Sequence, residues 1–134
     1  MEGIRVIPTR VHGILDYLGG LALILAPNIF GFTENDDATW VARIIGIALI
    51  VLALLTRYEL GVLKVLPMSL HLWIDVLASI FLAASPFLLG FSDEDANVWV
   101  PHVVVGLLYL VISLMTETVP RGDREELASP RMPR

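Results

Sequence analysis

Four long apolar runs constrain the fold of this 134-residue chain more than any other feature. The runs cover about residues 12–32, 38–56, 70–91 and 98–116. A helix of about 20 residues, rising ~1.5 Å per residue, crosses the ~30 Å hydrocarbon core of a bilayer. Hydrophobic residues make up 56% of the chain and charged residues only 17%. A chain of this composition has too few polar residues to cover the surface of a soluble domain. We therefore predict an all-α, polytopic membrane protein with four transmembrane helices.

Positive charges predict how these helices are oriented. Eight of the nine Lys and Arg residues lie before the first run, between the second and third runs, or after the fourth. The connections at 33–39 and 92–97 carry acidic residues but no Lys or Arg. Because Lys and Arg are enriched in cytoplasmic loops, both termini are expected in the cytoplasm. The chain has no cysteine, which excludes disulfides, thiolate metal sites and cysteine nucleophiles.

The sequence also repeats itself at an offset of 59 residues. The coinciding pairs are Pro8 and Pro67, His12 and His71, Asp16 and Asp75, Pro27 and Pro86, and Trp40 and Trp99. One further inserted residue aligns Gly46 with Gly106 and Thr56 with Thr116. Each repeat therefore predicts one helical hairpin, and a hairpin returns to the side from which it started. The two hairpins are expected to be parallel tandem repeats about an axis along the membrane normal.

The repeat pattern resembles a known family. "PTRVHGILDYLGGLALILAPNIFGF" and "PMSLHLWIDVLASIFLAASPFLLGF", each followed by a tryptophan, are similar to the SPW-repeat family of small prokaryotic membrane proteins. The resemblance implies a first repeat at 1–59, a second at 60–118 and a polar cytoplasmic tail at 119–134. It also implies the cytoplasmic (inner) membrane as the location. The chain departs from the family at the name-giving Ser-Pro-Trp, because it has Ala26-Pro27-Asn28 and Ser85-Pro86-Phe87.

The duplicated histidines and aspartates are the main candidate site. His12 with Asp16, and His71 with Asp75, are four residues apart and so share one helix face near the cytoplasmic end. Ionisable groups at this depth usually face the bundle interior. We expect them to hydrogen-bond each other and neighbouring helix ends. The alternatives are a proton relay and a divalent metal or haem between His12 and His71.

Other marked residues have simpler interpretations. Pro27 and Pro86 each remove a helix hydrogen bond and are expected to kink their helices. Arg43 is the one cation near the outer face, and we expect it to pair with Asp36 or Asp37. The sequence contains no nucleotide-binding motif, no nucleophile placed beside a base and no basic stripe for nucleic acid.

These features together favour a non-enzymatic protein with no catalytic residue. The leading hypothesis is a structural or accessory module in the lipid bilayer that self-associates or packs with a larger membrane complex. The alternatives are a proton-linked or metal-ion transporter or channel that uses the His–Asp pairs, and a metal- or haem-binding membrane protein.

Overall fold

The computed structural model describes residues 2–129, and within this range every regular element is helical. The elements are the 3-10 helix η1 (Glu2–Ile4) and the helices α1 (Thr9–Phe30), α2 (Asp36–Leu55), α3 (Met68–Leu88), α4 (Ala96–Met115) and α5 (Arg121–Ala128). The helices α1 to α4 are all long and apolar enough to cross a membrane. Each begins and ends slightly before the limits predicted from the apolar runs. The short helix α5 lies in the predicted polar tail, whose residues 130–134 are outside the described range.

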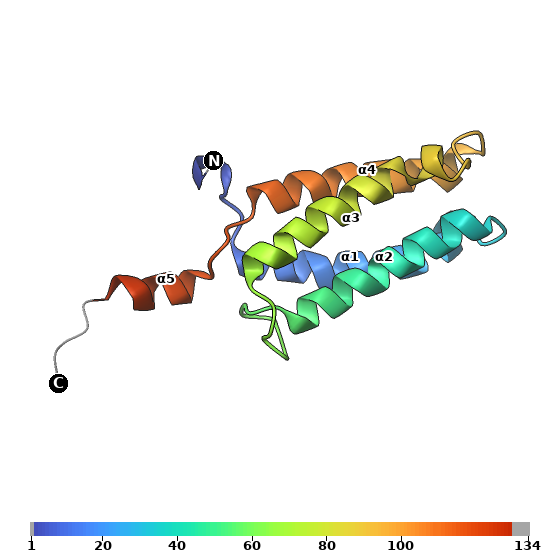
Figure 1. The fold of residues 1–134 in the computed structure, drawn as a ribbon. Helices are drawn as coiled ribbons and strands as arrows, with labels where there is room; N and C mark the ends of the chain where they lie inside the picture. Colours follow the sequence, from blue (N-terminus) through green and yellow to red (C-terminus); the bar gives the residue numbers. More distant parts are fainter. Residues whose placement is uncertain (1, 130–134) are drawn as a thin grey trace.

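The four long helices form two hairpins that lie side by side (Figure 1). Helix α1 packs mainly against α2, and α3 packs mainly against α4. Both hairpin turns lie at one end of the bundle. The α2–α3 connection, the N-terminal segment and α5 lie at the opposite end (Figure 1). This is the arrangement of parallel tandem hairpins that the repeated sequence predicts.

Proline and glycine set the helix limits in the same way in both repeats. Pro8 and Pro67 precede α1 and α3 in an extended conformation, and their carbonyls accept the backbone N–H groups of His12 and His71. At the other ends, Gly31 and Gly90 both have φ of 76°, a left-handed conformation that glycine adopts without steric cost. The prolines thus place each histidine at a defined position in the first turns of its helix.

Small residues allow each hairpin to close tightly. A Cβ atom added to Gly46 would lie 2.5 Å from the Gly20 carbonyl oxygen across the α1–α2 contact. In the second hairpin, a Cβ atom on Gly106 would lie 2.5 Å from the backbone nitrogen of Ala83. Small residues at such contacts are typical of transmembrane helix pairs. These four positions are therefore used within the hairpins.

Backbone hydrogen bonds fasten the end of the bundle opposite the turns. The Ile7 N–H donates to the Met115 carbonyl, and the Glu117 N–H donates to the Ile7 carbonyl, both at 2.9 Å. The equivalent bonds of the other repeat join Leu66 to Leu55 and Arg57 to Leu66, both at 2.8 Å. The segment before α1 is thereby attached to the end of α4, and the segment before α3 to the end of α2.

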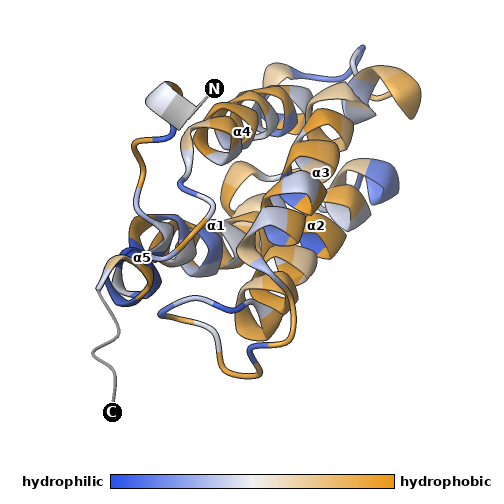
Figure 2. Ribbon diagram, turned by 60° about the vertical axis from the view of Figure 1, so that its left-hand side comes forward, coloured by the Kyte–Doolittle hydropathy of each residue, from blue (hydrophilic) through white to orange (hydrophobic). Residues whose placement is uncertain are grey.

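The outer faces of the bundle are apolar. Figure 2 shows that the long helices are mostly hydrophobic, whereas hydrophilic residues gather in α5 and in the connections. Large exposed side chains occur on all four helices, and examples are Leu18, Leu25, Ile47, Leu77 and Leu108. Because a soluble protein rarely exposes so much continuous apolar surface, these faces fit contact with lipid.

The close approach of α1 and α2 gives a first prediction. Gly46→Val should lower the free energy of unfolding by about 1–3 kcal/mol, because the new side chain meets backbone that cannot move aside. Reversible unfolding of the purified protein in detergent micelles measures the change. Gly122→Ala is the control, because nothing lies within 4 Å of its added Cβ. Equal stability of the Gly46 variant and the wild type would contradict the close packing.

Candidate functional site

The structure brings the two predicted His–Asp pairs together in one buried cluster. Nε2 of His12 lies 2.8 Å from Oδ2 of Asp75, and Nε2 of His71 lies 2.9 Å from Oδ2 of Asp16. Within each helix, the corresponding distances are 3.3 Å for His12–Asp16 and 3.0 Å for His71–Asp75. Each imidazole therefore bridges both carboxylates, one from each hairpin. We call these four residues the His–Asp cluster.

The second ring nitrogen of each histidine contacts a threonine at a helix end. Nδ1 of His12 lies 2.8 Å from the Thr116 hydroxyl, and Nδ1 of His71 lies 2.6 Å from the Thr56 hydroxyl. Each hydroxyl donates its single proton to a carbonyl one turn back in its own helix. It can therefore only accept from the histidine, and each Nδ1 must carry a proton.

This assignment fixes how many protons the cluster holds. With Nδ1 protonated, an unprotonated Nε2 would direct its lone pair at a carboxylate oxygen less than 3 Å away. A proton must therefore lie in each close Nε2–Oδ contact, on either the imidazole or the carboxyl group. The four side chains share two such protons and have no net charge. Neutrality matters because the cluster is fully buried, where an unbalanced charge would be costly.

Tyr58 and Glu59 cover the cluster on the side of the α2–α3 connection. The Tyr58 ring lies edge-on to His71, with ring centroids 6.1 Å apart. A Cβ atom on Gly13 would collide with that ring, so the glycine makes room for it. The Thr9 hydroxyl lies 2.8 and 3.0 Å from the two carboxylate oxygens of Glu59. Burial raises the pKa of the Tyr58 phenol, which therefore stays uncharged.

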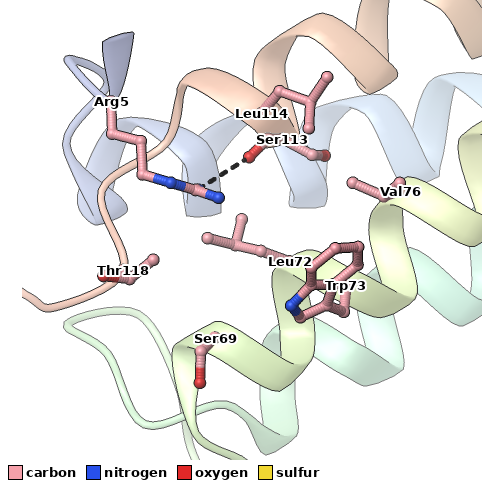
Figure 3. A pocket seen from close by; sticks show the side chains of 8 residues that line it. All are labelled: Arg5, Ser69, Leu72, Trp73, Val76, Ser113, Leu114 and Thr118. Carbon is pink, nitrogen blue, oxygen red and sulfur yellow. Dashed lines mark hydrogen bonds between the residues drawn. The ribbon is translucent and has the colours of Figure 1, made fainter. Parts of the chain in front are cut away.

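Arg5 lies above the end of α4 next to a small pocket between α3 and α4. Its guanidinium donates to the backbone carbonyl of Thr116 at 2.8 Å. It also donates to the carbonyl of Ser113 at 3.5 Å, the contact drawn in Figure 3. Trp73 and Leu72 form the apolar side of this pocket. A cation at a helix C-terminus is electrostatically favourable. Arg5 therefore reinforces the helix end that presents Thr116 to His12.

The third histidine of the chain lies near the opposite end of the bundle. His102 on α4 is buried, and its Nε2 donates to the Ala38 carbonyl of α2 at 2.9 Å. Its ring packs between Phe32 and Phe91, with centroid separations of 5.4 and 4.9 Å. His102 thus joins the two hairpins near the turns. Sequence analysis does not reveal this contact, because the equivalent position in the first repeat is Arg43.

The predicted ion pair of Arg43 with Asp36 or Asp37 is replaced by a different contact. Arg43 donates to the side-chain oxygen of Asn28 on α1 at 2.9 Å, and the described residues include no ion pair between Arg43 and either aspartate. The aspartates are six and seven residues before Arg43, which places them about 9 Å or more away along the helix axis. Both instead occupy the exposed first turn of α2, where negative charge stabilises the helix.

The two intrahelical prolines lie within α1 and α3, as expected. Each helix continues for two or three residues after its proline. In α3, the Ser85 hydroxyl donates at 2.7 Å to the Leu82 carbonyl, which is the carbonyl that Pro86 leaves without its usual helical donor. A buried polar group is thereby satisfied without water. In α1, the position equivalent to Ser85 is Ala26.

The fold and the cluster together define a small, multi-pass, all-helical membrane protein built from two tandem hairpins. The comparison with known families agrees with this description. Residues 10–116 match the SPW repeat domain, and the chain belongs to that family. No curated protein and no solved structure matches the chain.

The positions where this chain lacks the name-giving tryptophan have other contacts. Asn28 replaces it in the first repeat and accepts the hydrogen bond from Arg43. Phe87 replaces it in the second repeat and lies edge-on to Trp99, with centroids 6.5 Å apart. Both replacements join the two helices of their own hairpin near the turn.

The threonine contacts give a second prediction. Thr56→Val or Thr116→Val should lower the free energy of unfolding by about 1–3 kcal/mol, because each change leaves a buried histidine N–H without an acceptor. Unfolding in micelles measures the loss. Exposed Thr33→Val is the matched control and should have little effect. If both buried variants were as stable as this control, the assignment of a proton to each Nδ1 would fail.

Proposed function

We propose that the protein is a non-enzymatic structural module of the membrane, in which the His–Asp cluster locks two hairpins into one bundle. The observation that carries this proposal is the reciprocal crossing of the bonds. His12 of the first hairpin contacts Asp75 of the second, and His71 contacts Asp16. Separating the hairpins would leave each histidine without its partner across the interface, in a medium that cannot replace the bond.

The surroundings of the cluster support a clamp rather than a transport path. On the side of the hairpin turns, the next buried layer consists of Leu23, Leu49, Leu82 and Tyr109. Beyond it, Phe32 and Phe91 pack with small apolar side chains. A proton or ion moving from the cluster toward the turns would first meet the layer of Leu23, Leu49 and Leu82, which separates the cluster from His102. This layer favours the structural hypothesis over a proton-linked or metal-ion carrier.

The outer surface supports the second part of the proposal, an accessory role. Most of the closely packed small residues are used inside the hairpins, whereas the exposed faces of the long helices carry large apolar side chains. Such faces can contact lipid, another copy of the chain or a helix of a larger membrane complex. We therefore propose that the bundle acts as a rigid partner in a membrane assembly.

The clamp gives a third prediction, on the energy that joins the hairpins. A double-mutant cycle of His12→Gln and Asp75→Asn should give a coupling energy of at least about 1.5 kcal/mol, because removing either partner disrupts the same buried pair. Reversible unfolding of the metal-free protein in micelles measures it. The control is the surface pair Arg121 and Glu117, whose arginine side chain is 61% exposed, and its cycle should show a coupling below about 1 kcal/mol.

Two results would contradict this proposal. One is a His12–Asp75 coupling no larger than that of the surface control pair. The other is proton or metal-ion flux into proteoliposomes above the protein-free level that disappears when all four cluster residues are substituted. The second result would favour the transport alternative.

We further propose that both termini are cytoplasmic in the prokaryotic inner membrane, on the basis of the charge pattern. Because the chain has no cysteine, single cysteines can be introduced for labelling. Asn35→Cys and Ala96→Cys in the hairpin turns should react with a membrane-impermeant maleimide in intact cells, whereas exposed Val62→Cys in the α2–α3 connection should react only after lysis. The reverse pattern would overturn the orientation.

A further inference from the structure

We propose that the His–Asp cluster is a binding site for one divalent transition metal ion of the zinc type, held by two imidazole nitrogens and two carboxylate oxygens. This inference goes beyond the clamp, since the clamp requires only the hydrogen bonds. The ion would connect the same two hairpins, because each contributes one histidine and one aspartate.

The donor atoms already lie close to the dimensions of such a site. One donor atom from each of His12, Asp16, His71 and Asp75 can be chosen so that all four lie within 4.8 Å of one another. The four closest nitrogen–oxygen separations range from 2.8 to 3.3 Å. Tetrahedral zinc with bonds of about 2.0–2.2 Å requires ligand separations of about 3.4 Å. The nitrogen–oxygen contacts would therefore lengthen by a few tenths of an ångström, whereas the widest donor separation would shorten by up to about 1.4 Å.

The carboxylates also have unused acceptor capacity inside the cluster. Oδ1 of Asp75 is buried and has no hydrogen-bond partner among the described residues, and buried Oδ1 of Asp16 has only the 3.3 Å contact with Nε2 of His12. Buried carboxylate oxygens normally accept a hydrogen bond or contact a cation. The clamp thus leaves one of these oxygens without a partner and the other with a long contact only, and a metal ion would provide a cation for both.

The threonines supply the outer support that metal-binding histidines require. A histidine that binds metal through Nε2 generally donates its Nδ1–H to an oxygen, which fixes the ring orientation. Thr116 and Thr56 provide this acceptor for His12 and His71. Each hydroxyl is itself oriented by a helix carbonyl, so both rings are held before any ion arrives.

The exchange is balanced in charge and in protons. The cluster holds two protons in its nitrogen–oxygen contacts, and these occupy the positions where metal bonds would form. Binding one divalent ion releases both protons to solvent, leaving two neutral imidazoles, two carboxylates and a 2+ ion. The buried site is neutral before and after binding. The ion therefore adds no net buried charge to the bundle.

The donor set favours zinc over haem. The imidazole rings of His12 and His71 are 5.4 Å apart at their centroids and inclined at 74°, and both Nε2 atoms are directed at carboxylates. These carboxylates fill the position that a porphyrin iron would need. Two nitrogen and two oxygen donors suit a small divalent ion such as Zn²⁺ or Co²⁺.

Tyr58 contacts both the cluster and a pocket at the surface. Tyr58 lines an open pocket beside the α2–α3 connection together with Glu59, Lys64 and Asp123. The Tyr58 ring also lies edge-on to His71. Tyr58 therefore borders both the pocket and the cluster, and it has no equivalent aromatic residue in the second repeat, where Thr118 occupies its position.

The test measures zinc bound to the purified full-length protein in micelles, after equilibration with Zn²⁺ and dialysis against a weak chelator. Elemental analysis should give about one zinc per chain for a single four-ligand site. Asp16→Asn combined with Asp75→Asn should remove nearly all of it, because the amides keep the side-chain shape but lose both anionic ligands. Less than about a tenth of a zinc per wild-type chain would overturn the proposal.

Two controls separate this site from adventitious binding. Asp36→Asn with Asp37→Asn removes the same number of carboxylates from the exposed first turn of α2 and should leave the bound zinc unchanged. His102→Gln removes the third buried histidine and should also leave it unchanged. Zinc lost equally in the cluster variant and in either control would contradict a site at the cluster.

A measurement on the wild type keeps the test decisive if the cluster variant does not fold. Co²⁺ bound in place of zinc should give the intense visible bands of a tetrahedral ion with nitrogen and oxygen ligands. A weak six-coordinate spectrum would overturn the proposed geometry. The His12–Asp75 coupling is measured in metal-free protein, so it tests the clamp independently of zinc. Absence of zinc binding would contradict only the metal site, and a small coupling would contradict only the clamp.

Discussion

The structure depends on the reciprocal contacts between His12 and Asp75 and between His71 and Asp16. In a bilayer, apolar helix faces gain little by leaving lipid for one another, so burial alone does not determine which helices associate. Polar groups do determine it, because each one must find a partner inside the bundle. The cluster therefore selects one register between the hairpins, while the glycine contacts determine how closely each hairpin closes.

The two ends of the bundle join the hairpins through different contacts. Near the termini, the polar network joins all four helices and continues through Thr56 and Thr116 into the backbone bonds at Ile7 and Leu66. Near the turns, the hairpins are joined by the hydrogen bond of His102 to Ala38, its contacts with two phenylalanine rings, and a hydrogen bond from Asn97 to the Phe30 carbonyl. The first end therefore holds the chemistry that can bind a ligand, and the second is mainly a packing contact.

Much of this arrangement could be predicted from the sequence. Helix number follows from the four apolar runs, and hairpin pairing follows from the offset of 59 residues, because both depend on local composition. The contact of Thr56 and Thr116 with the histidines also follows, since all four lie at one membrane level. The exchange of partners between hairpins does not, because a spacing of four residues is equally compatible with pairing inside each helix. The partners of Arg43 and His102 could not be predicted, because these equivalent positions differ between the repeats and both partners lie on other helices.

The crossed bonding pattern has a consequence for how such a chain could originate. Each repeat carries one histidine, one aspartate and one threonine. Each histidine contacts the aspartate and the threonine of the other repeat. Two separate copies of a single ancestral hairpin would form the same cluster between subunits as this chain forms within one. Joining the two hairpins in one chain makes their 1:1 stoichiometry independent of concentration. It also allows the sequences of the two hairpins to differ. Differences such as Tyr58 opposite Thr118 can then appear, so that the two sides of a symmetrical centre have different neighbours.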